Sequence, residues 1–438
     1  MAGDIVRIDR LQVANFKGFQ HRELSFHPQF NLVVGRNGTG KTSILDALSI
    51  AVGSWFLGLR GYDSRHIKPV DVNLRSFVTE AMVTWEPQFP CSVEANGVVQ
   101  GQDLYWKRTL SGRGGRTTYG EARNIKQLAE KVELEVQQSQ PIILPLISYY
   151  GTGRLWNVPR EDAQVNTKPS SKTPRSRLDG YRNSVAPRLS VSEMINWIAG
   201  QAWYAFQHNG QKTAAYRAVC DALVRNVHNA KDISFDAKLG EVVVDFADGG
   251  RQPFTNLSDG QRCMLAVVGD IAQKAATLNP HLDNQVLLAT PGVVLIDELD
   301  LHLHPEWQRH VIENLRTTFP QIQFICTTHS PFLIQSLRSG EELVMLEGQP
   351  TANLGDLSIE KIAIGIQGVT ETAVSARYHE MKSVARNYLE TVDRAAEAPT
   401  TTIAAYKQQL ANNIAPYADN PAFQAFLEMK QTVKLGDE

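Results

Sequence analysis

The chain has 438 residues and an almost balanced charge, with Lys+Arg 44 against Asp+Glu 46 and a formal net charge of -2. This length accommodates two or three domains, or one large domain with insertions, and the charge balance excludes a general attraction to nucleic acid or anionic lipid. The four cysteines form no C-x-x-C pair, which argues against a disulfide framework and a zinc ribbon. The start of the chain has no signal-peptide pattern, and no stretch reaches the roughly 20 apolar residues of a membrane span. We therefore expect a cytoplasmic protein without membrane contact.

The first hundred residues have the pattern of antiparallel strands. Apolar and polar residues alternate over 5–16, which predicts a strand that pairs with 24–26 before a buried strand at 30–34. Further strand-like segments, separated by turn signals that include Asn96-Gly97, follow at 79–85, 92–99 and 104–109. We expect these segments to form an antiparallel β-subdomain.

A glycine-rich segment with the spacing G-x-x-x-x-G-K-T follows the strand at 30–34 and reads Gly35-Arg36-Asn37-Gly38-Thr39-Gly40-Lys41-Thr42. Glycines at this spacing let the backbone bend around an anion, and the helix expected at 41–52 adds its N-terminal amides. Lys41 would reach the β- and γ-phosphates, and the Thr42 hydroxyl would take one coordination position on Mg²⁺. The segment therefore predicts a nucleotide-phosphate site.

The middle of the chain contains a long polar stretch. A helix is expected at 124–138 and a buried strand at 141–150, which ends in Gly151-Thr-Gly-Arg154. The stretch 156–189 is poor in apolar residues, as loops are, and its basic residues are Arg160, Lys168, Lys172, Arg175, Arg177, Arg182 and Arg188. Two interpretations stay open, a solvated loop and a loop that contacts phosphates.

The second half of the chain predicts an α/β domain. Helices at 191–206 and 213–229 and a hairpin at 233–254, turned at 247–250, look like a lid inserted at about 155–250. Strands and helices then alternate at 293–296, 305–318, 323–327, 331–337 and 341–346, which implies a mostly parallel sheet. From about 359 the sequence is helical. We therefore expect a first domain at 1–345 and a C-terminal helical region at 346–438 that makes oligomer or partner contacts.

Two adjacent acids follow the apolar run Val293-Val-Leu-Ile296. This strand would place Asp297 at its carboxyl end, where it can hold Mg²⁺ opposite Thr42, and would set Glu298 beside the γ-phosphate to orient or deprotonate water. Two neighbouring carboxylates with these separate tasks suit nucleotide hydrolysis. The same residues could alone be an ordinary acidic strand end, but the phosphate loop upstream favours the catalytic interpretation.

Three histidines lie near these strands. His329 follows the strand at 323–327 and could contact the γ-phosphate and sense its loss, although a lone histidine is more often structural. His302 and His304 are two residues apart, as in some zinc sites, but the sequence offers no evident third and fourth ligand. We expect His329 to serve the nucleotide and expect no zinc site.

The segment Leu257-Ser-Asp-Gly-Gln-Arg262 opens a helix expected at 263–276. Ser258 can cap this helix, whose N-terminus then presents amides and a hydroxyl to an anion. In isolation such a hexapeptide is usually only a capped helix. Here it stands between the phosphate loop and the acidic strand, as the fourth part of an ordered set of motifs.

That order, G-R-N-G-T-G-K-T, L-S-D-G-Q-R, V-V-L-I-D-E-L-D-L-H-L-H-P and C-T-T-H-S-P, resembles the ABC-type ATPase heads of the RecF, SMC and OLD-like group. The resemblance covers about residues 5–346. It implies an α/β head with a mixed, largely parallel sheet, an antiparallel β-subdomain, an inserted helical lid and C-terminal helices. It also implies that two heads sandwich two ATP molecules with Mg²⁺, so that Ser258, Gly260 and Gln261 would act on the nucleotide of a second copy. Asp259 replaces the glycine usual in transporters, and for the glutamine of the Q-loop the candidates are Gln137, Gln138 and Gln140.

The chain lacks features of the larger members of this group. It has no long heptad arms of the SMC and break-repair kind, and after Leu346 it has no D-x-D pair of a Toprim nuclease. Segments such as P-L-I-S-Y-Y-G-T-G-R-L-W look like the compact ATPase subunits of Septu-type antiphage systems, some of which accompany retrons. This resemblance implies an oligomeric ATPase that controls a separate nuclease, expected to be of HNH type. The alternative is a RecF-like ATPase of DNA repair or recombination that binds DNA through the basic loop.

Overall fold

The computed structural model describes residues 6–78, 82–155, 176–187, 189, 191–347, 357–366 and 376–396, together with residues 405, 408, 427 and 429. The chain forms two compact units, Met1–Gly368 and Val369–Glu438. From the sequence we placed the boundary at 346, and this boundary stays a prediction. Among the described helices, none is long and apolar enough to cross a membrane.

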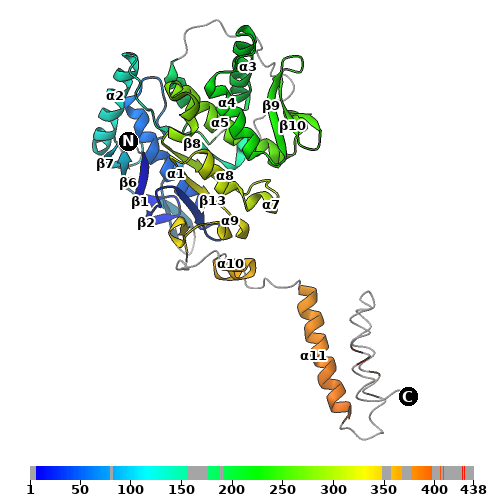
Figure 1. Cartoon of the computed structure of the whole chain (residues 1–438). Helices are drawn as coiled ribbons and strands as arrows, with labels where there is room; N and C mark the ends of the chain where they lie inside the picture. The colour runs from blue at the N-terminus through cyan, green and yellow to red at the C-terminus, as the bar shows by residue number, and fades with distance from the viewer. Residues whose placement is uncertain are drawn as a thin grey trace. The chain divides into compact units, whose positions relative to one another are not determined.

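A five-stranded parallel sheet lies at the centre of the larger unit (Figure 1). Its order is β14-β3-β13-β12-β8, and the strands are β3 (Phe30–Val34), β8 (Leu146–Tyr150), β12 (Gly292–Ile296), β13 (Ile322–Thr327) and β14 (Leu343–Met345). Every residue of β3, β8, β12 and β13 is buried. Such fully buried strands are expected where a parallel sheet is covered on both faces. The predicted α/β class is confirmed, with parallel and antiparallel strands in separate sheets.

The N-terminal strands form an antiparallel sheet of order β2-β1-β6-β7, built from β1 (Arg7–Phe16), β2 (Phe19–Ser25), β6 (Cys91–Val99) and β7 (Gln102–Leu110). The turn expected at Asn96-Gly97 is wrong, because β6 runs on to Val99 and the chain turns at Gln100-Gly101, both with positive φ. A Cβ at Gly97 would lie 2.1 Å from the carbonyl oxygen of Arg7 in β1. This glycine therefore permits a close approach of two strands rather than a turn.

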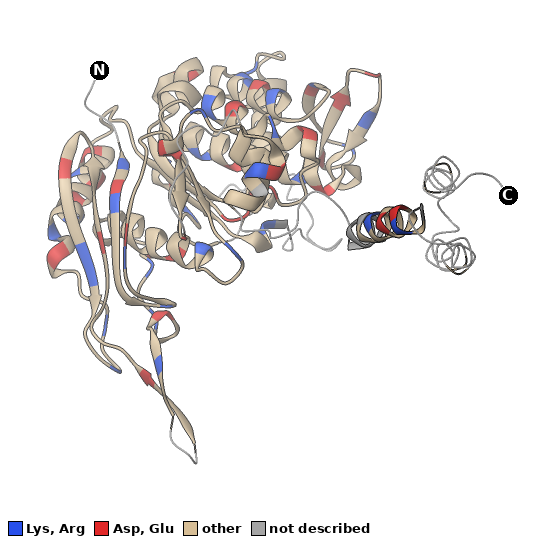
Figure 2. Cartoon of the chain, turned by 90° about the horizontal axis from the view of Figure 1, so that it is seen from below, with Lys and Arg blue, Asp and Glu red and all other residues tan. Residues whose placement is uncertain are grey.

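The single strand expected at 79–85 is also wrong. Two strands, β4 (Leu74–Val78) and β5 (Val83–Pro87), pair antiparallel on either side of 79–81, which lie outside the described residues. The hairpin projects as a narrow ribbon (Figure 2), and its large apolar side chains, such as Phe77 and Trp85, are exposed.

Helices cover the parallel sheet. Helix α1 (Lys41–Val52) contacts strands of both the antiparallel and the parallel sheets, and α5 (Asp259–Leu278) packs on β8. The helix α2 (Arg123–Gln137) packs on β7 of the antiparallel sheet, and the short α6 (Val286–Ala289) packs on α5 before β12.

The insertion expected between β8 and α5 contains helices and a small sheet. Helices α3 (Val191–Gln207) and α4 (Ala214–Asn226) pack on α5. The expected hairpin at 233–254 has a third strand, and the sheet consists of β9 (Ala230–Asp236), β10 (Glu241–Phe246) and β11 (Arg251–Pro253). Figure 1 shows α3, α4, β9 and β10 on the opposite side of the unit from β1, β2 and β6.

After β12, the helix expected at 305–318 is interrupted. It forms α7 (Pro305–Gln308) and α8 (Val311–Thr318), and α9 (Pro331–Gln335) and α10 (Ile359–Gly365) follow later in the unit. The second unit contains α11 (Ala376–Ala396), where Tyr388 and Val392 are buried together with Leu427. Of the region 346–438, for which we expect oligomer or partner contacts, 376–396 forms α11, whereas most of 397–438 lies outside the described residues.

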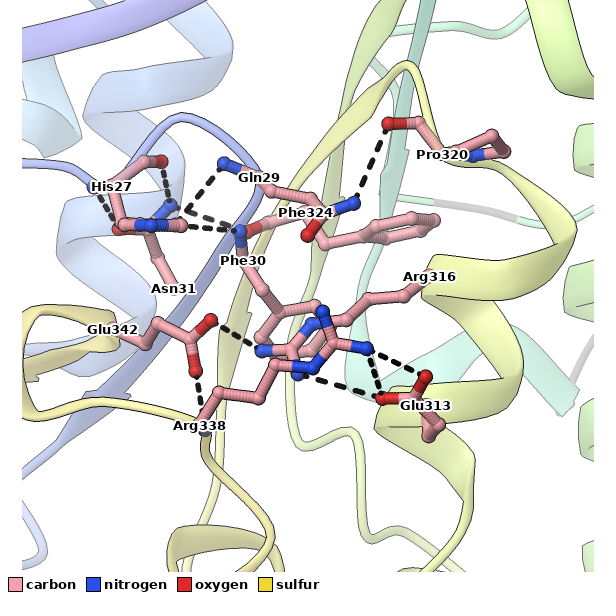
Figure 3. Close-up of polar contacts among 10 residues, drawn as sticks. All are labelled: His27, Gln29, Phe30, Asn31, Glu313, Arg316, Pro320, Phe324, Arg338 and Glu342. Atoms are coloured by element: carbon pink, nitrogen blue, oxygen red, sulfur yellow. Dashed lines mark hydrogen bonds and ion pairs between the residues drawn. The ribbon is translucent and has the colours of Figure 1, made fainter.

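A buried ion pair joins α8 to the start of β14 at the edge of the parallel sheet (Figure 3). The Nη2 of Arg316 donates to Oε1 of Glu342 at 2.5 Å, and the two side chains are only 2% and 3% exposed. The guanidinium also lies 5.2 Å from the centre of the Phe30 ring. The second oxygen of Glu342 accepts the Arg338 N–H at 2.8 Å. Both charges therefore have partners within the fold.

We predict that Glu342→Ala destabilises the protein by about 3–5 kcal/mol, because the variant leaves the Arg316 guanidinium buried without its carboxylate. The control is Glu341→Ala, which removes the exposed neighbouring carboxylate and should change stability by no more than about 0.5 kcal/mol. Urea unfolding followed by circular dichroism measures both values. Equal stabilities of the two variants would contradict a structural role for this pair.

Candidate functional site

The loops that follow the parallel strands meet at one edge of the sheet. Because β3, β8, β12 and β13 are parallel and adjacent in register, their carboxyl ends lie side by side. The glycine-rich segment follows β3, Asp297 and Glu298 follow β12, and His329 lies two residues after β13. The fold thus brings motifs from distant parts of the sequence to a single edge.

The segment Gly35 to Thr42 has the backbone that its glycines predict. Gly38 and Gly40 have φ of 83° and 97°, a region that side chains with a Cβ adopt at a cost. A Cβ at Gly40 would also lie 2.5 Å from the Phe19 ring, and one at Gly35 would lie 2.6 Å from Oγ1 of Thr39. The positive φ values and these close contacts disfavour a side chain in the loop, as expected for a backbone cradle around phosphates.

Lys41 is the first residue of α1 and reaches back across this loop. Its Nζ donates to the carbonyl oxygens of Gly35 at 2.8 Å and Arg36 at 3.1 Å. Burial lowers the pKa of the Lys41 ammonium, and the carboxylates of Asp297 and Glu298 oppose this shift. The ammonium thus lies inside the loop, with two acidic side chains near it.

Thr42 and Asp297 are in direct contact. The Thr42 hydroxyl donates to Oδ2 of Asp297 at 2.9 Å, and the Thr327 hydroxyl donates to Oδ1 at 2.6 Å. A hydroxyl and a carboxylate are hard oxygen donors, and Mg²⁺ is commonly held by one or two such groups together with substrate phosphates and water. The donor set next to the cradle therefore fits a Mg²⁺ ion that accompanies a nucleotide.

Glu298 stands next to this pair with an unusual backbone. Its φ is 50°, its side chain is half-buried, and its N–H donates to Oγ1 of Thr327 at 2.7 Å. From the sequence we did not assign a role to Arg154, which the fold brings to the same place. The buried Arg154 guanidinium donates to the carbonyl oxygens of Asp297 at 2.6 Å and Glu298 at 2.7 Å. The sequence feature that could have indicated a role for Arg154 is its place just after the buried strand β8, which ends at this edge of the sheet.

His329 and His304 lie in different parts of the structure. His329 is exposed beyond β13, and the preceding Thr328 donates to Oδ1 of Asp300 at 2.6 Å, which fixes the segment that carries it. His304 caps α7 by accepting the N–H of Glu306 on Nδ1 at 3.3 Å. In the part of the chain that the structure describes, no three His, Cys, Asp or Glu side chains form a group that could hold a metal.

The helix α5 begins with a capping box. The Ser258 hydroxyl accepts the Gln261 N–H at 3.4 Å, and the Gln261 side chain accepts the Ser258 N–H at 3.0 Å. Ser258 is exposed, whereas a Cβ at Gly260 would lie 2.6 Å from the carbonyl oxygen of His302. The start of α5 therefore packs directly on the segment that follows Glu298.

The three Q-loop candidates lie elsewhere. Gln137 ends α2, Gln138 caps it, and Gln140 also precedes the start of β8. Residues before a parallel strand approach the amino edge of the sheet, whereas Gly151 to Arg154 follow β8 at the carboxyl edge. The segment that contacts the backbone of Asp297 and Glu298 at the carboxyl edge is thus one without glutamine.

The basic loop is only partly described. Arg160, Lys168, Lys172, Arg175 and Arg188 lie outside the described residues. Arg177 donates to the carbonyl oxygens of Ile142 and Gln140, both at 2.8 Å, and Arg182 pairs with Asp179 at 3.1 Å. Figure 2 shows basic and acidic residues interspersed along the ribbon of the described residues. The described arginines thus bind the chain itself, and DNA binding by this loop stays a prediction.

Two family models match the chain. One is described as "AAA domain" and matches residues 10–196. The other is described as "AAA domain, putative AbiEii toxin, Type IV TA system" and matches residues 123–335. The matched residues include Gly35 to Thr42, Ser258 to Gln261, Asp297, Glu298 and His329.

Curated relatives match most of the chain. "Retron Vc95 probable ATPase" from Vibrio cholerae is 23% identical over 90% of this chain and 84% of the relative, and "Retron Ec83 probable ATPase" from Escherichia coli is 24% identical over 80% and 73%. "Septu protein PtuA" from Bacillus mycoides is 26% identical over 78% of this chain but only 41% of that protein's length. A solved SMC head domain from Thermotoga maritima has a TM-score of 0.40 and 14% identity, over 77% of this chain and 94% of that chain.

The ordered motifs, their assembly at one sheet edge and the matched families agree on the kind of protein. A phosphate cradle, a Thr–Asp pair and an adjacent glutamate are the parts that nucleotide hydrolysis needs. The two retron relatives, which match 90% and 80% of this chain, carry ATPase in their names. The chain is therefore an ATPase that resembles the RecF and SMC group and, within it, the compact ATPases of retron and Septu systems.

Proposed function

We propose that this protein is the ATP-hydrolysing subunit of an antiphage complex, in which two heads sandwich ATP and the nucleotide state controls a separate nuclease. The observation that carries the proposal is the 2.9 Å contact between Thr42 and Asp297, with Glu298 next in sequence. The names of the retron and Septu relatives support the biological setting.

The residues at the carboxyl edge of the sheet have separate roles in hydrolysis. The N–H groups of Gly35 to Gly40 and the Lys41 ammonium bind the phosphates, and Thr42 and Asp297 would hold Mg²⁺, which neutralises charge on the phosphate oxygens. Glu298 accepts a proton from the water that attacks the γ-phosphate, while the bond to the leaving β-phosphate oxygen breaks. His329 contacts the γ-phosphate from the neighbouring strand end.

The second half of each site comes from a second copy of the chain. Ser258 is exposed at the N-terminus of the 20-residue helix α5, where free amides and the helix dipole favour an anion. With Gly260 and Gln261 it would close over the γ-phosphate of ATP bound to the partner copy. We propose that a nuclease of HNH type binds the C-terminal helical region, including α11, and responds to closure of the heads.

We predict that Gly40→Ala weakens ATP binding at least about tenfold, because a positive φ disfavours alanine and the added methyl meets the Phe19 ring. The matched control is Gly18→Ala, on the turn just before Phe19, where an added Cβ has no atom within 4 Å. Titration with a fluorescent ATP analogue measures both affinities. Unchanged affinity of the Gly40→Ala protein would argue against the cradle.

We predict that Glu298→Gln binds ATP normally, accumulates as a closed dimer and hydrolyses ATP at least about tenfold more slowly, because an amide does not accept the proton of the attacking water. Light scattering measures the dimer, and phosphate release measures the rate. Lys41→Ala should lose nucleotide binding, whereas Glu306→Gln, at an exposed position of α7, should behave as the wild type. Equal hydrolysis by the Glu298→Gln and wild-type proteins would contradict the assigned role.

The nuclease proposal is tested by mixing the purified protein with the product of the neighbouring gene. We expect a stable complex whose nuclease activity differs between ATP and ADP. The Lys41→Ala protein should form the same complex without this difference. Absence of a complex, together with nuclease activity that ignores ATP, would exclude the proposed control.

A further inference from the structure

A buried arginine lies directly behind the catalytic glutamate. Arg154 follows β8 in the short 3₁₀ turn Thr152–Leu155, and its side chain is only 1% exposed. Its Nη1 and Nη2 donate to the carbonyl oxygens of two consecutive residues, Asp297 and Glu298. Burying a guanidinium is costly unless its donors are satisfied. Here consecutive carbonyl groups satisfy both terminal nitrogens, so the arginine holds the peptide groups on both sides of the Glu298 Cα.

The backbone of Glu298 needs such support. Its φ of 50° is uncommon for a residue with a side chain. Its N–H is held by Thr327, and its carbonyl oxygen accepts both the Leu301 N–H at 3.0 Å and Arg154 at 2.7 Å. This conformation decides where the Glu298 carboxylate points relative to the cradle. Since Arg154 is buried and its terminal nitrogens bond backbone carbonyls, it acts on the reacting groups through the backbone of Asp297 and Glu298.

The same guanidinium reaches helix α5. Its Nε donates to Sγ of Cys263 at 3.2 Å, and Cys263 is buried five residues after Ser258. A second contact lies nearby, where Gly260 packs against the carbonyl of His302. Helix α5 and the segment from Asp297 to His302 are therefore joined at two points within one head.

We propose that Arg154 is a positioning residue that sets the conformation of Glu298 and couples it to the start of α5. The inference rests on the proposed head dimer, in which Ser258 binds the nucleotide of the second copy while Glu298 acts on the head's own nucleotide. Contact of Ser258 with the partner's ATP then reaches Glu298 through α5, Cys263 and Arg154. Hydrolysis at the two sites of the dimer is consequently interdependent.

The positioning role is tested with Arg154→Lys and Arg154→Met in the full chain, without a nuclease. Lysine keeps the charge but lacks the planar guanidinium fork that reaches both carbonyls and Cys263 together. Either variant should therefore exchange the amide hydrogens of 297–299 at least about tenfold faster in the nucleotide-free protein. The kcat should fall at least about tenfold, as is typical when a partner behind a reacting carboxylate is lost, while affinity for a fluorescent ATP analogue stays within about twofold. A folded variant with wild-type exchange and kcat would overturn the role, and so would a loss of affinity as large as the loss of kcat.

The coupling is tested with cysteine variants that leave Arg154 in place. Cys263→Ala removes the acceptor and should lower the Hill coefficient of ATP hydrolysis toward about 1, whereas Cys263→Ser keeps an acceptor and should retain the cooperativity. Cys220→Ala, at a buried position of α4, is the control and should hydrolyse as the wild type. A wild-type Hill coefficient of about 1, or unchanged cooperativity in Cys263→Ala, would overturn the coupling.

The readouts separate this inference from the proposed function. Amide exchange at 297–299 reports on Arg154 in the protein without nucleotide and without a nuclease. Wild-type hydrolysis no faster than that of Lys41→Ala would instead count against the ATPase itself. A missing nuclease complex would change neither result.

Discussion

A single hydroxyl at the end of β13 holds the site together. Thr327 donates to Oδ1 of Asp297 and accepts the N–H of Glu298. Because a hydroxyl has one proton, the donation to the carboxylate leaves its lone pairs free for the amide, and each bond fixes the direction of the other. The second oxygen of Asp297 accepts from Thr42. The ends of β12 and β13 and the start of α1 are therefore joined through one carboxylate, and the distance between the cradle and Glu298 depends on it.

The position of helix α1 is also fixed by interactions of its residue Asp46. Its carboxylate pairs with Lys17 and, at 2.6 Å, with Arg65, and it accepts the Tyr149 hydroxyl at 3.3 Å. Burial raises the pKa of the Tyr149 phenol, and the Asp46 charge adds to the shift, so the phenol stays a neutral donor. Since Tyr149 belongs to β8, this network ties the cradle helix to the strand that carries Arg154 at its end. The Asp46 network thus helps to position both the phosphate loop and Arg154.

Local patterns in the sequence predict local parts of the site well. The strand at Phe30–Val34, the glycine loop and α1 were all predictable, because spacing and periodicity within a dozen residues determine them. Arg154 was not predictable in this way, since its partners Asp297 and Glu298 lie 143 and 144 residues away. Gly97 misled for a related reason. Together with Asn96 it has the sequence of a turn, but the glycine is explained by the close approach of β1. No local sequence pattern reveals that approach.

The energies involved explain why Glu298 needs more than one support. A residue with a side chain pays on the order of 1–3 kcal/mol in this part of φ space, whereas a neutral hydrogen bond such as that from its N–H to Thr327 contributes about 1 kcal/mol. The two terms leave about 0–2 kcal/mol against this conformation, so the bond to Thr327 alone does not secure the balance between conformations. A bond from a charged donor contributes about 1.5–3 kcal/mol, enough to shift that balance more than tenfold. Because this donor also contacts helix α5, small movements of α5 would act on the Glu298 backbone. In the proposed head dimer, a contact made by one copy of the chain would then alter the chemistry of the other site.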